Sequence, residues 1–590
     1  MSKKMLLVAR YYSIEPLGIL YLAGAVRDML GWECRVVLIS ECDFRPLYEV
    51  VRDWKPDLVG FQVWTGYHGP VFGACDYVRA LGIPVVIGGP HATYYHENCA
   101  IHADWVIRGS GFGLFRRLLE GVLPKGVHFD KAGREEPFPL PDREIVYREY
   151  PELGASPIKS IFASVGCPFF CTYCYASSFN QMHGGFKLSV RPVGEIIAEA
   201  QDMLSRWPLK MVYFQDDIFG YDIKWLEEFA RMWKARVGIP FHCQIRLELV
   251  NHSSGDRRLD LFKNAGCTGI TLAIESGNEF LRDHVLFRHM HGEVIEDGCR
   301  KVLSRGMTLR TEQILAVPFS DTATDLATLG LNNRIGPTMA WTSILVPYGG
   351  TNMGTIVNNF GLYDGNNDDL AETFFNRSVL RHVAGGPRDI ESAISKSELD
   401  PRSRALLEMR AVKTAGEGNA KIIHEEKGVV GALQYLDEVA NQRYCDDTVR
   451  LQRHFMWLAK VPGAELLGRK LLAVPEHEWS WKVMGKITEE HLRHVGIKSD
   501  RLDRWKKELA SQMGLPGVGQ FPQLVSDNPW YFVFFPETSV LIDSLISQRV
   551  FEEADFTETQ KRLGSIMRRH LFHYGLYQIE KAKSPIVHAP

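Results

Sequence analysis

The stretch CPFFCTYC at residues 167–174 places three cysteines within eight positions, directly after the apolar run at residues 161–166. The spacing is C-x3-C-x2-C, and no fourth cysteine is nearby. Three thiolates this close together suit an iron–sulfur cluster in which one iron has no protein ligand. That open iron offers a place for a small molecule to bind.

A structural zinc site is the main alternative for these cysteines. Such sites normally use four ligands, often as two separated pairs, and no second pair follows Cys174. Buried thiols without a metal are disfavoured, because three of them lie within eight residues beside the turn-forming Gly166 and Pro168. The iron–sulfur interpretation is therefore preferred.

The pattern C-x3-C-x-Φ-C, with Tyr173 as the aromatic Φ, resembles the signature of the radical SAM superfamily. The resemblance implies that Cys167, Cys171 and Cys174 hold a [4Fe–4S] cluster. It also implies that the amino and carboxylate groups of S-adenosyl-L-methionine (SAM) chelate the fourth iron, with Tyr173 near the adenine.

Upstream of the motif, short apolar runs alternate with helical stretches. Strands are expected at residues 5–9, 34–39, 57–63 and 83–89, and helices at 17–30, 46–54 and 71–80. This alternation predicts an α/β, doubly wound, Rossmann-like sheet with right-handed crossovers. A ligand of such a sheet lies beyond the carboxyl ends of the strands.

The expected strand ends resemble the cobalamin-binding domain that precedes the barrel in one large class of radical SAM enzymes. The matching stretches are PLG at 16–18, WTGYH at 64–68, GGPHAT at 88–93 and VIRGSG at 106–111. The resemblance implies corrinoid contacts from Gly18, Trp64, Thr65, Gly66, Tyr67, His68, Gly88, Gly89, His91 and Gly109. The alternative is a plain Rossmann-like domain whose glycines serve only as turns.

The match to the cobalamin-binding domain is incomplete. Ser110 and Phe112 stand where the family usually has glutamates, and the D-x-H-x-x-G motif of the base-off mutases is absent. Neither His68 nor His91 is therefore assigned as a cobalt ligand, since a lone histidine is more often a hydrogen-bonded loop residue.

Residues 158–354 are expected to form a partial (β/α)6 TIM-like radical SAM barrel. Polar residues at the carboxyl ends of barrel strands are typical of site residues. The resemblance implies that Asp216 or Asp217 binds the SAM amino nitrogen, and Arg246 is a candidate partner of the SAM carboxylate. The alternative for the two aspartates is to cap the next helix.

Glu275 and Ser276 follow a further apolar strand in a segment that resembles the family's G-I-E-S-G stretch. A carboxylate at the end of such a strand needs a partner, which the SAM hydroxyls, the open iron or a basic side chain would supply. Glu275 and Tyr173 are the candidate catalytic residues.

Four segments are expected in the chain. They are a cobalamin-binding domain at 1–125, a proline-rich extended linker at 126–157, the barrel at 158–354 and a mostly α-helical substrate or cap domain at 355–590. The last segment is dense in aromatic residues but carries no motif, so the sequence does not indicate the substrate.

Composition limits the class of protein and its compartment. The 590 residues are 45% hydrophobic and 24% charged with a net charge of −3, which gives no case for nucleic acid. The eight cysteines outside the motif are scattered, as in a protein of the reducing cytoplasm. The apolar run at 17–26 is too short to span a bilayer.

The resemblance implies a cobalamin-dependent radical SAM methyltransferase, served by an electron donor such as flavodoxin or ferredoxin. It would transfer a methyl group from SAM, by way of methylcobalamin, to an unactivated carbon of a small molecule such as a natural product.

Three alternatives stay open. One is non-methylating cobalamin chemistry, such as ring contraction or cyclisation. Another is a polar variant resembling a tryptophan methyltransferase, in which SAM is not cleaved and Glu275 holds the open iron. The third is a metal-stabilised binding or sensor protein.

Overall fold

The computed structural model describes most of the chain between residues 2 and 497. The residues outside this description are 1, 12–14, 41–42, 131–138, 186–187, 280, 360, 371–374, 376, 383–440, 457, 476–477, 479–480 and 498–590. Much of the segment expected to be helical at 355–590, including its aromatic residues at 505–535, lies outside the described residues.

The first domain is built on a six-stranded sheet, sheet A, in which every strand is parallel to its neighbours. In chain order its strands are β1 (Lys3–Arg10), β2 (Trp32–Ile39), β3 (Leu58–Gln62), β4 (Val85–Gly88), β5 (Trp105–Gly109) and β6 (Gly126–Asp130), and the order across the sheet is β2-β1-β3-β4-β5-β6. The predicted Rossmann-like fold class is confirmed.

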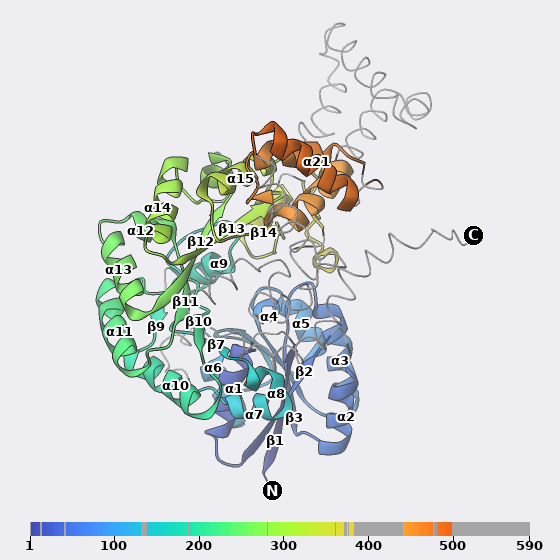
Figure 1. Ribbon diagram of the computed structural model, residues 1–590. Helices are drawn as coiled ribbons and strands as arrows, with labels where there is room; N and C mark the ends of the chain where they lie inside the picture. Colours follow the sequence, from blue (N-terminus) through green and yellow to red (C-terminus); the bar gives the residue numbers. More distant parts are fainter. Residues whose placement is uncertain are drawn as a thin grey trace, which may run out of the picture.

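Helices cover both faces of sheet A, as Figure 1 shows for the blue part of the chain. They are α1 (Leu17–Arg27), α2 (Arg45–Trp54), α3 (His68–Ala80), α4 (Pro90–Tyr94), α5 (His96–His102) and α6 (Phe112–Leu119). Alternate residues of β1 explain this layering: Met5 and Leu7 enter one hydrophobic core, whereas Leu6 and Val8 enter the other. A strand buried on both faces reads as the continuous apolar run seen in the sequence.

The stretch 126–157 is not an extended linker in the described structure. It begins with strand β6 and continues, after the gap at 131–138, into α7 (Arg143–Glu149) and α8 (Pro151–Ala155). Val146, Tyr147 and Leu153 are buried in the same core as one face of sheet A. The proline-rich run precedes α7, where Asp142 caps the helix by accepting a bond from the Ile145 N–H.

The second domain is built on sheet B, which also has six parallel strands and curls into a half-barrel (Figure 1). Its order is β14-β13-β12-β11-β10-β7, formed by β7 (Ile158–Ile161), β10 (Met211–Phe214), β11 (Phe241–Ile245), β12 (Cys267–Glu275), β13 (Thr308–Leu315) and β14 (Met339–Ile344). The predicted partial (β/α)6 barrel is confirmed.

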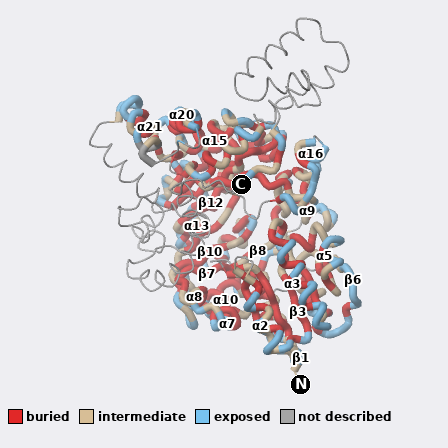
Figure 2. The backbone as a smooth tube through the Cα atoms, turned by 90° about the vertical axis from the view of Figure 1, so that its right-hand side faces the viewer, coloured by how far each residue is buried: buried red, intermediate tan, exposed pale blue. Residues whose placement is uncertain are grey.

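The outer face of sheet B is covered by helices that connect its strands. They are α10 (Val193–Arg206), α11 (Ile223–Arg236), α12 (Leu247–Asn251), α13 (Gly255–Ala265), α14 (Gly292–Ser304) and α15 (Thr322–Ile335). Figure 2 shows buried residues running through both sheets and exposed residues on the outer helices. A small antiparallel pair, β8 (Ser164–Val165) with β9 (Ser189–Val190), is connected by the cysteine loop and α9 (Tyr175–Met182).

A buried ionic network joins the two domains. Arg143 of α7 binds Glu15, which follows β1, and also donates to Glu199 of α10 at 2.7 Å. Glu199 accepts a second bond from Arg191 at 2.7 Å, and Glu15 accepts from the Ser160 N–H of β7 at 2.6 Å. All four charged side chains are buried, so removing one partner leaves a charge in a low-dielectric interior.

Beyond the barrel the described chain forms short helical elements. They are α16 (Asn352–Asn359), the 3-10 turn η2 (Asn367–Asp369), a helix through residues 441–456, α20 (Ala464–Leu472) and α21 (Trp481–His494). Leu467 and Leu471 of α20 pack with Leu326 and Leu329 of α15 in one core. Among the described residues, no helix is both long enough and apolar enough to cross a membrane.

Candidate functional site

The cysteine loop lies between β8 and α9. Cys167 and Cys171 are buried, and Cys174 is the residue before α9. The loop is held by its neighbours: Asn180 donates to the Cys167 carbonyl at 2.5 Å, and Thr172 Oγ1 donates to the Val285 carbonyl at 2.6 Å. Burial raises the pKa of Cys167 to about 11 and also raises that of Cys174. Their thiolates therefore need a cationic partner, such as iron.

The number of cysteines fits a cluster better than a single zinc ion. The loop supplies three cysteines, and no fourth cysteine is nearby in the sequence. A structural zinc ion normally takes four protein ligands, whereas an iron–sulfur cluster held by three cysteines keeps one iron open.

Two arginines approach Cys171. Arg246, just after β11, donates from Nη1 to the Cys171 sulfur at 2.8 Å, and its Nε donates to Glu248 at 3.1 Å. Arg288 places Nη1 3.8 Å from the same sulfur, while its buried Nε has no hydrogen-bond partner among the described residues. Arg246 is thus already paired, whereas Arg288 retains a buried N–H donor.

Arg288 was not found by sequence reasoning. It lies in the loop after the π-helical turn η1 (Leu281–Val285), outside any strand end. Its other contact is with the carbonyl of Ala273 in β12. Nothing in its sequence context distinguishes it from the chain's other arginines, so it is identified by its contacts alone.

Glu275 ends β12 in an unusual backbone conformation. Its φ is +71°, and the pairing of β12 with β13 shifts register between Ala273 and Glu275. A non-glycine residue rarely adopts positive φ, and such bulges often re-aim a side chain next to a site.

The Glu275 carboxylate accepts a bond from Tyr173 Oη at 2.5 Å. Burial raises the pKa of Glu275, and the positive charge of Arg288 and the Tyr173 hydrogen bond act against that rise. The two candidate catalytic residues therefore share one polar contact within reach of the cysteine loop.

The aspartates after β10 have different surroundings. Asp216 is buried and accepts bonds from the Ala163 N–H at 3.0 Å and from Ser164 Oγ at 2.5 Å, and burial raises its pKa to about 7. Asp217 is exposed, and its negative charge helps to raise the pKa of Cys167. Neither aspartate caps the next helix, because Asp222 is the N-cap of α11. The helix-capping alternative is therefore wrong.

Ser276 follows Glu275 and is buried. Its Oγ accepts a bond from the Asn278 N–H at 3.2 Å, and its carbonyl accepts from Arg282 at 2.6 Å. These contacts are within the turn after β12, so the structure gives Ser276 a local partner.

The carboxyl edge of sheet A gathers two stacked imidazoles. The rings of His68 and His91 lie 4.2 Å apart. His91 pairs with Thr65 Oγ1 at 3.0 Å and Asn98 Oδ1 at 3.3 Å, while His68 Nε2 pairs with Asp368 of η2 at 2.8 Å. Burial lowers the pKa of His91 to about 4, so this ring is neutral.

The remaining predicted corrinoid contacts surround these histidines. Gly89 has φ +100°, and a Cβ there would come within 2.9 Å of the Val63 carbonyl. The other predicted residues are Gly18 in α1, the β3–α3 loop residues Trp64, Gly66 and Tyr67, and Gly88 and Gly109 at the ends of β4 and β5. Beside Gly109, Ser110 Oγ is buried without a partner in the described structure, which fits a ligand that carries polar groups.

An aromatic seam joins the strand ends of the two domains, and sequence reasoning missed it. Tyr175, the first residue of α9, stacks on Tyr94 at 4.1 Å and on Tyr348 at 5.0 Å. A Cβ at Gly349 would meet Tyr95 Oη at 2.6 Å. This close approach explains why position 349 takes a residue without a side chain.

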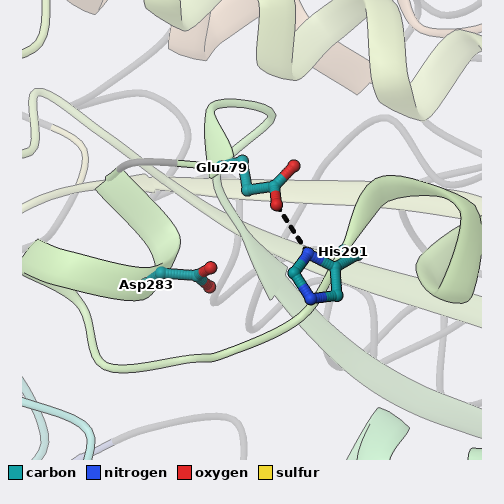
Figure 3. A group of neighbouring side chains, drawn as sticks. All are labelled: Glu279, Asp283 and His291. Carbon is teal, nitrogen blue, oxygen red and sulfur yellow. Dashed lines mark hydrogen bonds and ion pairs between the residues drawn. The ribbon is translucent and has the colours of Figure 1, made fainter.

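Figure 3 shows Glu279, Asp283 and His291, whose potential ligand atoms lie within 4.8 Å of one another. His291 Nδ1 already pairs with Glu279 at 2.5 Å, and Asp283 accepts a bond from the Met290 N–H at 3.2 Å. Glu279 and His291 are exposed. These hydrogen bonds hold the segment at 290–291 against residues 279–283.

Comparison with known proteins agrees with both halves of this geometry. Residues 161–325 match the radical SAM superfamily, and residues 3–119 match the B12 binding domain. The chain is therefore a B12-dependent radical SAM protein, for which the two domains imply a [4Fe–4S] cluster, SAM and cobalamin.

The relatives identify the type of enzyme. An uncharacterised methyltransferase of Pyrococcus horikoshii is 23% identical over 366 residues, covering 57% of this chain and 77% of that protein. Bacteriochlorophyllide d C-8(2)-methyltransferase of Chlorobaculum tepidum is 24% identical over 325 residues, covering 51% and 68%. The chain is a radical SAM methyltransferase.

A solved structure shares the fold. The radical SAM methyltransferase TsrM of Kitasatospora setae, solved with cobalamin and a [4Fe–4S] cluster, is 18% identical, covers 61% of this chain and 78% of its own, and has a TM-score of 0.50. At this identity the likeness concerns the fold alone.

Proposed function

We propose that this methyltransferase moves a methyl group from SAM, by way of a corrinoid, to a carbon atom of a small molecule. The observation that supports this most strongly is the contact between the strand-end loops of the two domains. Tyr94 Oη donates to the Tyr175 carbonyl at 2.8 Å, and Tyr175 follows Cys174 directly. The carboxyl edge of sheet A, here called the corrinoid edge, therefore lies next to the cysteine loop.

On this proposal Cys167, Cys171 and Cys174 hold the cluster, and Tyr173 lies against the adenine. Arg288 binds the SAM carboxylate through its unpaired buried Nε, while Arg246 keeps its bonds to Cys171 and Glu248 and adds positive charge beside that carboxylate. When bound, the cluster and SAM supply radical chemistry and cobalamin carries the methyl group. An external electron donor such as flavodoxin or ferredoxin completes the requirement.

Other side chains at the carboxyl edge of sheet B support the binding of the cluster and SAM. Asp216 ties the strand before the cysteine loop to β10 through Ala163 and Ser164, which makes it a positioning residue. The Tyr173–Glu275 hydrogen bond holds a proton between the phenol and the carboxylate, at the floor of the SAM site.

At the carboxyl edge of sheet A, backbone groups and small residues are proposed to bind the corrinoid. Gly18, Gly66, Gly88, Gly89 and Gly109 let the chain approach a large ring closely. Trp64, Thr65, Tyr67, His68 and His91 line that edge. Neither imidazole is proposed as a cobalt ligand, because His68 Nδ1 accepts from the Gly66 N–H at 3.2 Å and the other ring nitrogens are paired as well.

A second candidate is the variant in which Glu275 occupies the open iron and SAM stays intact. The position of Glu275 supports it, because the buried carboxylate accepts a bond from Tyr173 of the cysteine loop and the charge of Arg288 offsets part of the rise in pKa that burial causes.

The test is anaerobic reconstitution of the full chain, followed by incubation with SAM, methylcobalamin, a reductant and candidate metabolites. Formation of S-adenosylhomocysteine with a product one methyl group heavier supports methyl transfer. Stoichiometric 5′-deoxyadenosine supports the radical route, and its absence supports the Glu275 variant. A protein that takes up zinc but neither iron nor corrinoid would overturn both.

A further inference from the structure

A large cavity lies beyond the barrel, between described residues of two stretches, 358–369 and 377–381, and the helix through 441–456. Its volume is about 920 Å³, within the range of small-molecule sites. Six of its lining residues are charged: Asp364, Asp369, Arg377, Arg381, Asp446 and Arg453. None of the residues given to the cluster, SAM or the corrinoid lines this cavity.

The walls of the cavity reach both cofactor edges. Asp369 lines it, and the adjacent Asp368 bonds to His68 at the corrinoid edge. Tyr363 also lines it and belongs to the same hydrophobic cluster as Tyr173 of the cysteine loop. Helix α16 connects the cysteine loop to the cavity. At one end its Met353 N–H donates to the Thr172 carbonyl at 2.8 Å, and near the other end Asn358 lines the cavity.

The lining carries charge of both signs beside the apolar side chains of Leu362, Val379, Leu380 and Val449. Within the described chain, Arg377 and Arg381 form no ion pair, although Arg377 donates to the Asp369 carbonyl at 2.8 Å. Asn358, Asn441 and Gln442 add amide donors and acceptors. A fused hydrocarbon ring here would strip water from these charges without replacing it, which is strongly unfavourable.

We propose that this cavity binds the methyl acceptor and that the acceptor is a zwitterion of the amino acid or short peptide type. Arginines then meet its carboxylate and aspartates its ammonium group through charge-assisted hydrogen bonds. The inference rests on the proposed methyl transfer and adds the substrate class. This substrate class differs from those in the names of two relatives, a bacteriochlorophyllide d methyltransferase and a hopanoid methylase.

The test measures binding to the reconstituted full chain by saturation-transfer NMR. The probes are the common amino acids, a set of dipeptides, the same dipeptides with acetylated and amidated ends, and a hopanoid. The variants are Arg381→Gln and Asp446→Asn, and the control is Arg305→Gln, whose arginine pairs with Asp256 and Asp260 on the barrel's outer helices.

Free dipeptides or amino acids should bind, and both cavity variants should weaken that binding by at least about tenfold while the control does not. Blocking the ends of the probe should have a similar effect in the unaltered chain. Binding of the hopanoid, retention of zwitterion binding in both variants, or no zwitterion binding at all would overturn the inference. Iron, corrinoid and SAM turnover measured on the same samples would show whether the proposed function stands regardless.

Discussion

The two parallel sheets end in edges of opposite character. At the carboxyl edge of sheet A, polar side chains bond to one another: Thr65 with His91, and His68 with Asp368. At the edge of sheet B, Glu275 has a strained backbone and Arg288 has an unpaired buried nitrogen beside Cys171. The first edge suits a large ligand recognised by shape, and the second suits a charged ligand recognised by ion pairing.

The largest effect is expected at the cysteine loop. Cys171→Ala should abolish cluster assembly, because the other two thiolates cannot hold the cluster alone. Iron content after anaerobic reconstitution checks this. Cys299→Ala, a change at a buried cysteine of α14, should leave the iron content unchanged. Full iron loading of the Cys171 variant would show that the loop is not the cluster site.

Arg288→Met tests the carboxyl edge of sheet B, where ion pairing is expected to bind SAM. It should weaken SAM binding by at least about tenfold and leave cobalamin binding unchanged, since it removes a buried cation while keeping a long apolar side chain. Equilibrium dialysis with each cofactor measures both affinities. Arg305→Met is the control, because Arg305 is only partly buried and pairs with Asp256 and Asp260 of α13. An equal loss of both affinities would mean that the two edges are not distinct.

Gly89→Ala tests the carboxyl edge of sheet A, where close fit is expected to bind cobalamin. The new Cβ would press on the Val63 carbonyl at a positive φ, which should cost about 1–3 kcal/mol and weaken cobalamin binding, not SAM binding. Gly82→Ala is matched, because Gly82 also has positive φ but open space around its Cβ position. Absorbance titration with hydroxocobalamin compares them. Equal affinity in both variants would remove the role given to close backbone approach.

Asp325→Asn is expected to have the smallest effect and concerns the support of sheet B. Asp325 accepts a bond from Tyr444 at 2.8 Å, and burial raises its pKa to about 7. The folded chain then holds more protons than the unfolded chain between about pH 4 and 7, so its stability falls as the pH rises through that window.

The variant should flatten that fall, as measured by thermal unfolding at several pH values. Asp321→Asn is the contrasting change, because hydrogen bonding to Thr324 lowers the pKa of Asp321. The folded chain loses that stabilisation as the pH falls. An unaltered slope in the Asp325 variant would mean that this carboxyl group does not set it.

Local patterns were enough to predict both sheets and the half-barrel. The apolar runs of β1 and β12 and the tight cysteine spacing carry their information within a few residues. Strands β5 and β6 were not among the expected strands. Residues 106–111 were interpreted only as a stretch that resembles the cobalamin-binding domain, and GVHFD at 126–130 has little apolar content and forms the edge of the sheet. A proline-rich run follows it, which suggested a linker.

The site was less predictable, because its contacts join distant residues. His68 and Asp368 are 300 positions apart, and Arg288 contacts Cys171 across 117. No periodicity records such pairs. The corrinoid and SAM roles of the individual residues stay predictions, as do the bounds of the three expected domains, whereas the expected linker at 126–157 is corrected to β6, α7 and α8.

The buried network around Arg143 affects how this chain is made. Glu15 leaves the ribosome early, yet the partners that hold it, Arg143, Tyr147 and Ser160, are synthesised more than 120 residues later. Until then its carboxylate must remain in water, and the first sheet cannot close that side of its core. A fragment ending at residue 125 would keep this charge permanently unmatched. The two cofactor domains therefore mature as one unit, and neither is expected to serve as an independent module for transfer into another protein.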